Sequence, residues 1–237
     1  MIDIKKLKII VLTMAIISHT NIANATYDFS NLRTDHEIVA KYEHGGKGYE
    51  AISKDNYGGS SYGKWQISTK KQKNGKSTFE LFLLYMKSKN KVYYTLLQDA
   101  GGYNSAFNGE QKFKETWKRI CNNSDFREIY DDFILNTQII PTYERLAKTN
   151  DKNFNKVLKW GIENEVIQAA INSAIIQHGQ YGCYKLIRRV VENNGITNEE
   201  NFLKDLYRVR KTIHFRYKNR YEREYADLNK KLKTISA

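Results

Sequence analysis

The sequence predicts an α+β protein in which helices predominate and one small β-hairpin is inserted among them. Three observations indicate this class. Beyond residue 77, apolar residues recur every three or four positions over most of the chain, which is typical of helices packed around a core. Residues 163–179 are apolar nearly all round, as in a buried helix. Residues 49–68 combine glycines with short segments that favour small strands.

The N-terminus has the composition of a secretory signal peptide. It carries lysines at the start, an apolar run over residues 9–17, and the small-residue cleavage site Ala23-Asn24-Ala25. The apolar run is too short to cross a bilayer as a helix, and an uncleaved anchor is the alternative. We therefore expect residues 1–25 to be removed and residues 26–237 to form one periplasmic or secreted domain without a membrane anchor.

The first helix of that domain is expected to begin at Thr34. A threonine followed three residues later by Glu37 makes a capping box, and Gly45-Gly46 ends the helix. Glu43 then lies in the last turn, where the negative end of the helix dipole and burial by the apolar face both raise the pKa of its carboxyl group. A carboxyl group that stays protonated near neutral pH can act as a general acid. The ordinary alternative is a solvated glutamate.

Three short segments follow in a fixed order: Glu43-His44, then Ala51-Ile52-Ser53, then Ser61-Tyr62-Gly63-Lys64-Trp65-Gln66. This order resembles the lysozyme-like superfamily, which includes goose-type lysozymes, soluble lytic transglycosylases and phage-associated peptidoglycan hydrolases. His44 departs from the serine that is commoner there. The resemblance implies a lysozyme-like domain in which Glu43 is the catalytic acid and a β-hairpin lines the cleft. The residues that it implies for the sugar site are Ser61, Tyr62, Trp65 and Gln66.

The mechanism depends on a second carboxylate, which retaining and inverting glycosidases both require. Asp55 is the better candidate because it follows in the strand or turn segment that should face the helix end, and Glu50 is the weaker one. Asp55 also lies in a composition that favours a turn. The transglycosylases that this chain resembles use one glutamate alone, so hydrolysis and transglycosylation both remain open.

The rest of the chain is predicted to be helical. Ser77 and Glu80 make a second capping box, and Pro141 kinks or restarts a later helix. The apolar helix over residues 163–179 is expected to end at Gly179.

Two polar side chains, Gln177 and His178, precede that glycine. They either face the cleft and bind substrate or satisfy backbone carbonyls at the helix end. In several phage-associated members of the superfamily that this chain resembles, a similar central helix ends in Gln-His-Gly, and both interpretations stay open.

The tail over residues 198–232 is expected to be one long amphipathic helix or two in succession. Tyrosines and aliphatic residues form a stripe toward the core, with arginines and lysines on the outer face. Interleaved arginine and tyrosine could instead bind single-stranded nucleic acid. In an exported protein, Cys121 and Cys183 could pair as a disulfide or remain buried free thiols. The sequence favours neither.

The net charge of +13 suits an anionic partner. We expect a monomeric, exported glycosidase that cleaves the β-1,4 bonds between MurNAc and GlcNAc in peptidoglycan, with Glu43 as general acid/base and no nucleic-acid partner. No cofactor or metal is predicted, since ligand spacings and nucleotide motifs are missing from the sequence. The alternatives are a non-catalytic wall-binding or secretion-apparatus protein, an exported nucleic-acid binder, and a chitinase or chitosanase.

Overall fold

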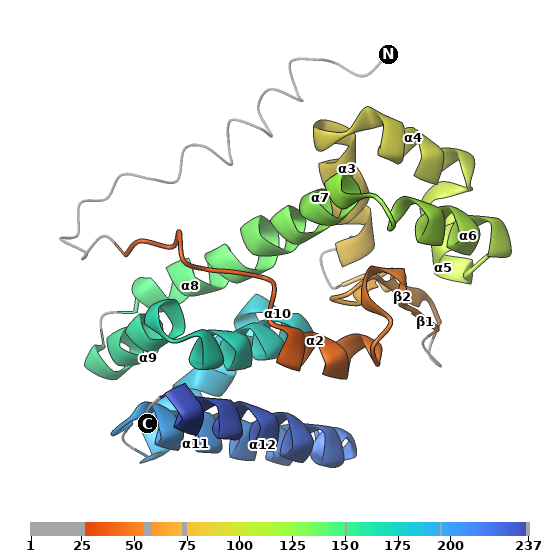
Figure 1. Cartoon of the computed structure of the whole chain (residues 1–237). Coiled ribbons are helices and arrows are strands. Elements are labelled where there is room, and N and C mark those ends of the chain that lie inside the picture. The colour runs from red at the N-terminus through yellow and green to blue at the C-terminus, as the bar shows by residue number, and fades with distance from the viewer. Residues whose placement is uncertain (1–26, 55–57, 73–74, 150, 195, 236–237) are drawn as a thin grey trace.

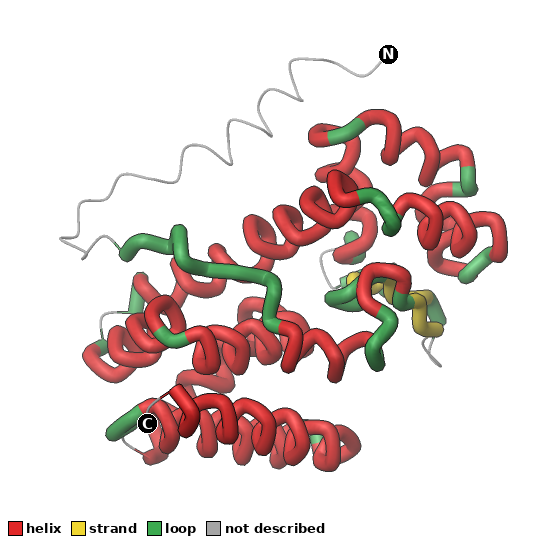
Figure 2. Tube along the Cα trace, viewed as in Figure 1, coloured by secondary structure: helices red, strands yellow, loops and turns green. Residues whose placement is uncertain are grey.

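The computed structural model describes residues 27–54, 58–72, 75–149, 151–194 and 196–235. The predicted signal peptide and Asp55 lie outside these residues. Within them helices predominate and the strands form one small patch (Figure 2), which confirms the predicted α+β class. The helices are α2 (Glu37–His44), α3 (Thr78–Lys89), α4 (Lys91–Asp99), α5 (Gly102–Asn108), α6 (Gln111–Ile120), α7 (Ser124–Ile134), α8 (Ile140–Ala147), α9 (Lys152–Glu163), α10 (Glu165–Asn194), α11 (Glu199–Ile213) and α12 (Lys218–Ile235).

The helices form two groups connected by a nearly continuous rod (Figure 1). The rod consists of α7, the π-helical segment η2 (Leu135–Ile139) and α8. Pro141 sits in the first turn of α8, directly after the π-helical segment, so the rod changes its helical geometry just before the proline. Helices α3 to α6 pack with the sheet at one end of the rod, and α9 to α12 pack around α10 at the other. Helix α2 contacts α10 and α12 and leads directly toward the sheet.

The sheet has three antiparallel strands, β1 (Ile52–Lys54), β2 (Ser60–Tyr62) and β3 (Ile67–Ser68), in the order β1-β2-β3. A single-turn 3₁₀ helix, η1 (Gly48–Glu50), joins α2 to β1. The predicted hairpin is therefore present, with a third strand added. The turn between β2 and β3 needs a glycine at position 63, because φ there is +79° and a Cβ would lie 2.6 Å from the Tyr130 ring.

The core of the sheet-bearing group is aromatic. Its rings meet mostly edge to face, at centroid distances of 5.1–6.2 Å. The members are Tyr62, Phe79, Phe82, Phe113, Trp117, Phe126, Tyr130 and Phe133. In the other group, α10 is buried over the apolar turns that its sequence predicted. Both cysteines are buried and free, so of the two alternatives the structure has the unpaired thiols.

Local capping was predicted correctly at one helix and wrongly at another. Ser77 and Glu80 form the expected capping box at α3. Helix α2 instead begins at Glu37, and no side chain caps it. The Glu37 carboxylate lies 2.9 Å from the Lys64 ammonium, whose side chain is only 6% exposed. The predicted box is absent because His36, rather than Thr34, occupies the N-cap position.

The structure resolves two further expectations for the helices. Gly179 has non-helical backbone angles, φ 69° and ψ 171°, so the apolar helix ends there as predicted, and a second helix follows across the kink to Asn194 within α10. The tail forms two helices, α11 and α12, rather than one long helix. Their side chains do not follow the predicted basic outer face throughout, since Arg210 is fully buried and Arg220 is mostly buried.

Candidate functional site

Glu43 lies in the last turn of α2, as its spacing from the glycines predicted. Gly45 ends the helix in the left-handed conformation, and its N–H donates to the Lys41 carbonyl at 3.0 Å. The Glu43 side chain is only 8% exposed because α2 packs against α10 and α12 at this point. A carboxyl group that is almost out of water at a helix C-terminus has an unusual environment for its charge.

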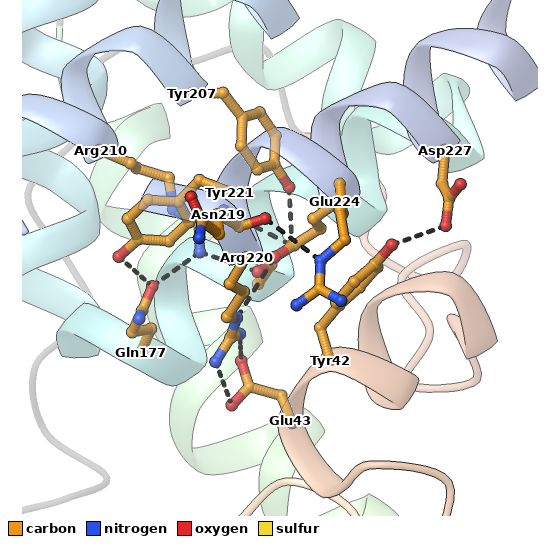
Figure 3. A network of polar contacts seen from close by, with 12 residues as sticks. Tyr42, Glu43, Gln177, Tyr207, Arg210, Asn219, Arg220, Tyr221, Glu224 and Asp227 are labelled. Atoms are coloured by element: carbon orange, nitrogen blue, oxygen red, sulfur yellow. Dashed lines mark hydrogen bonds and ion pairs between the residues drawn. The ribbon is translucent and has the colours of Figure 1, made fainter. Parts of the chain in front are cut away.

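Arg220 of α12 is the direct partner of Glu43 (Figure 3). Its guanidinium donates to both carboxylate oxygens, with a distance of 3.4 Å from Nη1 to Oε2. The same guanidinium lies beside a second carboxylate, with Nε 3.6 Å from Glu224 Oε2. Arg220 therefore bridges Glu43 to a buried acid.

Glu224 and Arg210 complete a network that extends into the core. Both side chains are 0% exposed, and Arg210 Nη1 lies 3.6 Å from Glu224 Oε1. The Tyr207 hydroxyl donates to the same oxygen at 2.7 Å. Arg210 is also held between two aromatic rings, with its guanidinium carbon 4.8 Å from the Tyr207 centroid and 4.6 Å from the Tyr221 centroid.

Gln177 joins the same network. Its Oε1 accepts from Arg210 Nη2 at 2.8 Å and from the Tyr221 hydroxyl at 2.7 Å. Its side chain therefore binds other side chains rather than the backbone carbonyls of the helix end. We call Glu43, Gln177, Tyr207, Arg210, Arg220, Tyr221 and Glu224 the buried charge network. It holds two arginines and two carboxylates, so its formal charges balance.

The electrostatics of this network fit a proton-carrying role for Glu43. Burial raises the pKa of the Glu43 carboxyl above its ordinary value, and the neighbouring Arg220 opposes this shift without cancelling it. The raised pKa favours a protonated Glu43 at a higher pH than for a solvated glutamate. When Glu43 is protonated, Arg220 still has Glu224 as a counter-charge.

His178 lies at the edge of this region, with its ring centroid 4.9 Å from that of His214. Burial, together with Arg210 and the other nearby cations, lowers the pKa of His178 to about 3, so the ring is neutral. Its Nε2 is buried, and no described residue hydrogen-bonds to it. A neutral imidazole in this position is not placed to exchange protons near pH 7.

The four residues expected at the sugar site occupy two kinds of position. Tyr62 and Trp65 are 0% and 2% exposed, so they offer almost no surface to a glycan in this structure. The Tyr62 hydroxyl donates to the Ala106 carbonyl, and the Trp65 backbone N–H donates to the Tyr130 hydroxyl. Ser61 is half-buried, on the middle strand of the sheet.

Gln66 is also half-buried and has unusual backbone geometry. Among the described residues, it is the one non-glycine with a positive φ, at 49°. Its amide is held on both sides, since Oε1 accepts from Ser53 Oγ at 2.5 Å and Nε2 donates to the Gly63 carbonyl at 2.9 Å. A strained backbone with a fixed side chain is the kind of feature that functional sites often carry.

The second carboxylate of the predicted mechanism is not placed, because Asp55 lies outside the described residues. Glu50 is exposed on η1. The acid that the structure brings near Glu43 is Glu224, which the sequence analysis did not single out. A signal for it exists, because Glu224 follows Tyr221 by three residues and precedes Leu228 by four, on the inward stripe of α12.

The described part of the chain contains no group of three or more His, Cys, Asp or Glu side chains arranged to hold a metal ion. Within that same part, every helix is too short or too polar to traverse a bilayer. A hollow of about 630 Å³ lies at the opposite end of α2 from Glu43, and its lining includes His36, Glu165 and Lys231. It does not include the buried charge network.

Comparison with known proteins gives a family and a fold. The family described as "Type VI secretion system spike protein VgrG3-like, C-terminal" matches residues 36–233. No curated protein sequence matches the chain.

The similar solved structures include several chitosanases. Native chitosanase from Bacillus subtilis MY002 is 18% identical, with a TM-score of 0.54 over 84% of this chain and 86% of that chain. Chitosanase OU01, co-crystallised with substrate, is 16% identical, with a TM-score of 0.51 over 74% and 75%. At such low identities the likeness shows the fold alone, which is the lysozyme-like glycosidase fold.

Proposed function

Because the chain belongs to the family of type VI secretion system spike protein VgrG3-like C-terminal domains, we propose that it cleaves the β-1,4 bonds between MurNAc and GlcNAc in peptidoglycan. One observation carries the proposal: the Glu43 carboxyl lies buried at the end of α2, with a raised pKa, in a lysozyme-like fold. We also propose that the protein acts outside the cytoplasm, on the strength of the signal peptide expected over residues 1–25.

Glu43 would act by protonating the glycosidic oxygen as the bond to the anomeric carbon breaks. The positive charge that develops on the sugar is then relieved by a water molecule or by the 6-hydroxyl of the same sugar. Asp55 remains the candidate base for a water. Arg220 supports this step because it can hold the Glu43 carboxylate after the proton has left. It also lies beside Glu224, which remains as its counter-charge when Glu43 is protonated.

Charge favours peptidoglycan over chitosan as the substrate. The chain carries a net charge of +13, and chitosan is itself a polycation at the pH where its amines are protonated. Peptidoglycan carries carboxylates on its peptide stems, so a basic enzyme is attracted to it. A mutant of the chitosanase from Bacillus subtilis MY002 has been crystallised in complex with 6 GlcN, which makes chitosan the natural comparison substrate.

The direct test is mass spectrometry of the soluble products from purified sacculi and from chitosan, each incubated with the mature protein. We expect muropeptides from sacculi and little release from chitosan. Reducing-end products would identify a hydrolase, and 1,6-anhydro products a lytic transglycosylase. Release from chitosan alone would replace the proposal with a chitosanase. Sedimentation with sacculi without any product would indicate a wall-binding protein.

The pH dependence of cleavage should report the environment of Glu43. A general acid works only while protonated, so kcat/KM should fall as pH rises through the pKa of Glu43, and this fall should lie above the ordinary glutamate value of about 4.3. Arg220→Met removes the cation that opposes the shift, so the fall should move to still higher pH.

Arg223→Met is the matched control, because Arg223 is exposed on the same helix. Arg223→Met should not shift the dependence of kcat/KM on pH. A profile that moves to lower pH in Arg220→Met would contradict the role given to this ion pair, whatever the effect on the maximal rate.

A further inference from the structure

A second hollow, of about 420 Å³, lies on the sheet-bearing side of the molecule. Its cationic lining consists of four lysines, and we call it the lysine hollow. Its lining residues are Lys47, Glu50, Ile52, Lys54, Ser60, Lys114 and Lys118. It does not contain Glu43, but Lys47 follows that residue by four positions, across the glycine turn that ends α2. The hollow therefore includes a residue of the short segment that joins α2 to η1.

The fold gathers these lysines from three separate segments. Lys54 lies opposite Ser60 in the β1–β2 register, and Lys114 and Lys118 are one turn apart on α6. Gly109 lets α6 approach the sheet here, since a Cβ at that position would lie 3.1 Å from Ser60 Oγ and 3.2 Å from Lys114 Cε. The tertiary packing therefore brings four lysines of separate segments to the lining of one hollow.

The charge of the hollow is not neutralised within the described part of the chain. None of its four lysines forms an ion pair there, whereas Lys41, Lys64 and Lys231 each do. Glu50 is the one carboxylate in the lining, and no described cation lies within ion-pair distance of it. Like charges gathered inside one hollow repel one another over a Debye length of about 8 Å, so a bound anion would relieve a cost that the fold carries.

We propose that the lysine hollow binds the carboxylates of the peptide stems of peptidoglycan, an inference that rests on the proposed function. Lysines act as point charges that accept carboxylates in varied orientations, without the fixed fork of arginine. The methyl groups of stem alanines can contact Ile52, the one apolar side chain in the lining. A chitosan chain has ammonium groups at the equivalent places, and these lysines would repel it.

The test is sedimentation with purified sacculi at low salt, in a Glu43→Gln background that keeps the sacculi intact. Lys114→Gln/Lys118→Gln should bind about five- to tenfold more weakly, as expected for the loss of two partly exposed charge contacts. Lys156→Gln/Lys204→Gln is the control, with the same change in net charge on exposed lysines of α9 and α11. It should bind like the parent protein.

Two further arms isolate the carboxylates. Lys114→Arg/Lys118→Arg keeps the charge and should keep the binding. Sacculi whose carboxylates have been converted to amides should bind the parent protein as weakly as they bind the glutamine variant. Equal weakening in both glutamine double variants would reduce the effect to net charge, and binding that is insensitive to amidation would overturn the proposal.

The outcome is separable from that of the proposed function. Lysine-dependent binding without any cleavage by the wild-type protein would support the binding role of the lysine hollow and contradict the proposed enzymatic activity. Cleavage of sacculi with unchanged binding in Lys114→Gln/Lys118→Gln would support the enzymatic activity and contradict the binding role.

Discussion

Glu43→Gln is expected to lower the rate of muropeptide release from sacculi by about 10²- to 10⁴-fold, the usual contribution of a positioned general acid. The amide has nearly the same shape and can still accept a hydrogen bond from Arg220, but it cannot deliver a proton to the glycosidic oxygen. The measurement is the initial rate of soluble product release, with the products identified by mass spectrometry.

Glu222→Gln is a suitable control for this substitution. Glu222 lies on α12 between Arg220 and Glu224, but its side chain is 45% exposed and pairs only with surface lysines. We expect its rate to stay within about twofold of wild type, because exposed ion pairs contribute little. If Glu43→Gln kept more than a tenth of the activity, the proton would have to come from another group and the assignment of Glu43 would fall.

Arg210→Met should have the largest effect on stability among single substitutions in the buried charge network. Removing one partner of a buried ion pair typically costs about 3–5 kcal/mol, because the other charge is left uncompensated. Here Glu224 would lose one of its two arginines, and Ser173 and Gln177 would each lose a donor. For a chain of this size, that corresponds to a fall in Tm of roughly 6–20 °C. Urea denaturation gives the free energy of unfolding directly.

Arg208→Met places the same change two residues away on α11. Arg208 is 56% exposed and pairs with Asp205 on the surface, so its loss should cost less than about 1 kcal/mol. A double variant, Arg210→Met with Glu224→Leu, should be less unstable than the sum of its two single variants, because it removes both charges together. A loss below about 1 kcal/mol in Arg210→Met would mean that water reaches the network.

Several features of this protein could be predicted from short stretches of sequence. The glycines at 45 and 46 fix the end of α2, and with it the place of Glu43 in the last turn. Ser77 and Glu80 cap α3 reciprocally. In each case the deciding interaction joins backbone and side-chain groups only three or four residues apart, so the local sequence contains both partners.

Other local patterns were outweighed by partners from distant segments. The box predicted for Thr34 and Glu37 does not form, because α2 begins at Glu37 with His36 at the N-cap position, and the Glu37 carboxylate pairs with Lys64. Tyr62 and Trp65 looked like sugar-binding aromatics, and the fold uses them as core.

Composition and periodicity were enough to predict the predominance of helices, the small sheet and the position of one carboxyl group at a helix end. The surroundings of that carboxyl group depend on how the helices pack. Arg220 is 177 residues from Glu43 along the chain. Arg210 and Glu224 pair in the core, but their positions in the sequence do not distinguish them from the many charged residues on these helices that remain in water. Pairs of this kind form because helix packing removes both partners from water at the same place. Local sequence propensities cannot predict such pairs, because the interaction energy between the two charges exists only when distant segments meet in the folded chain.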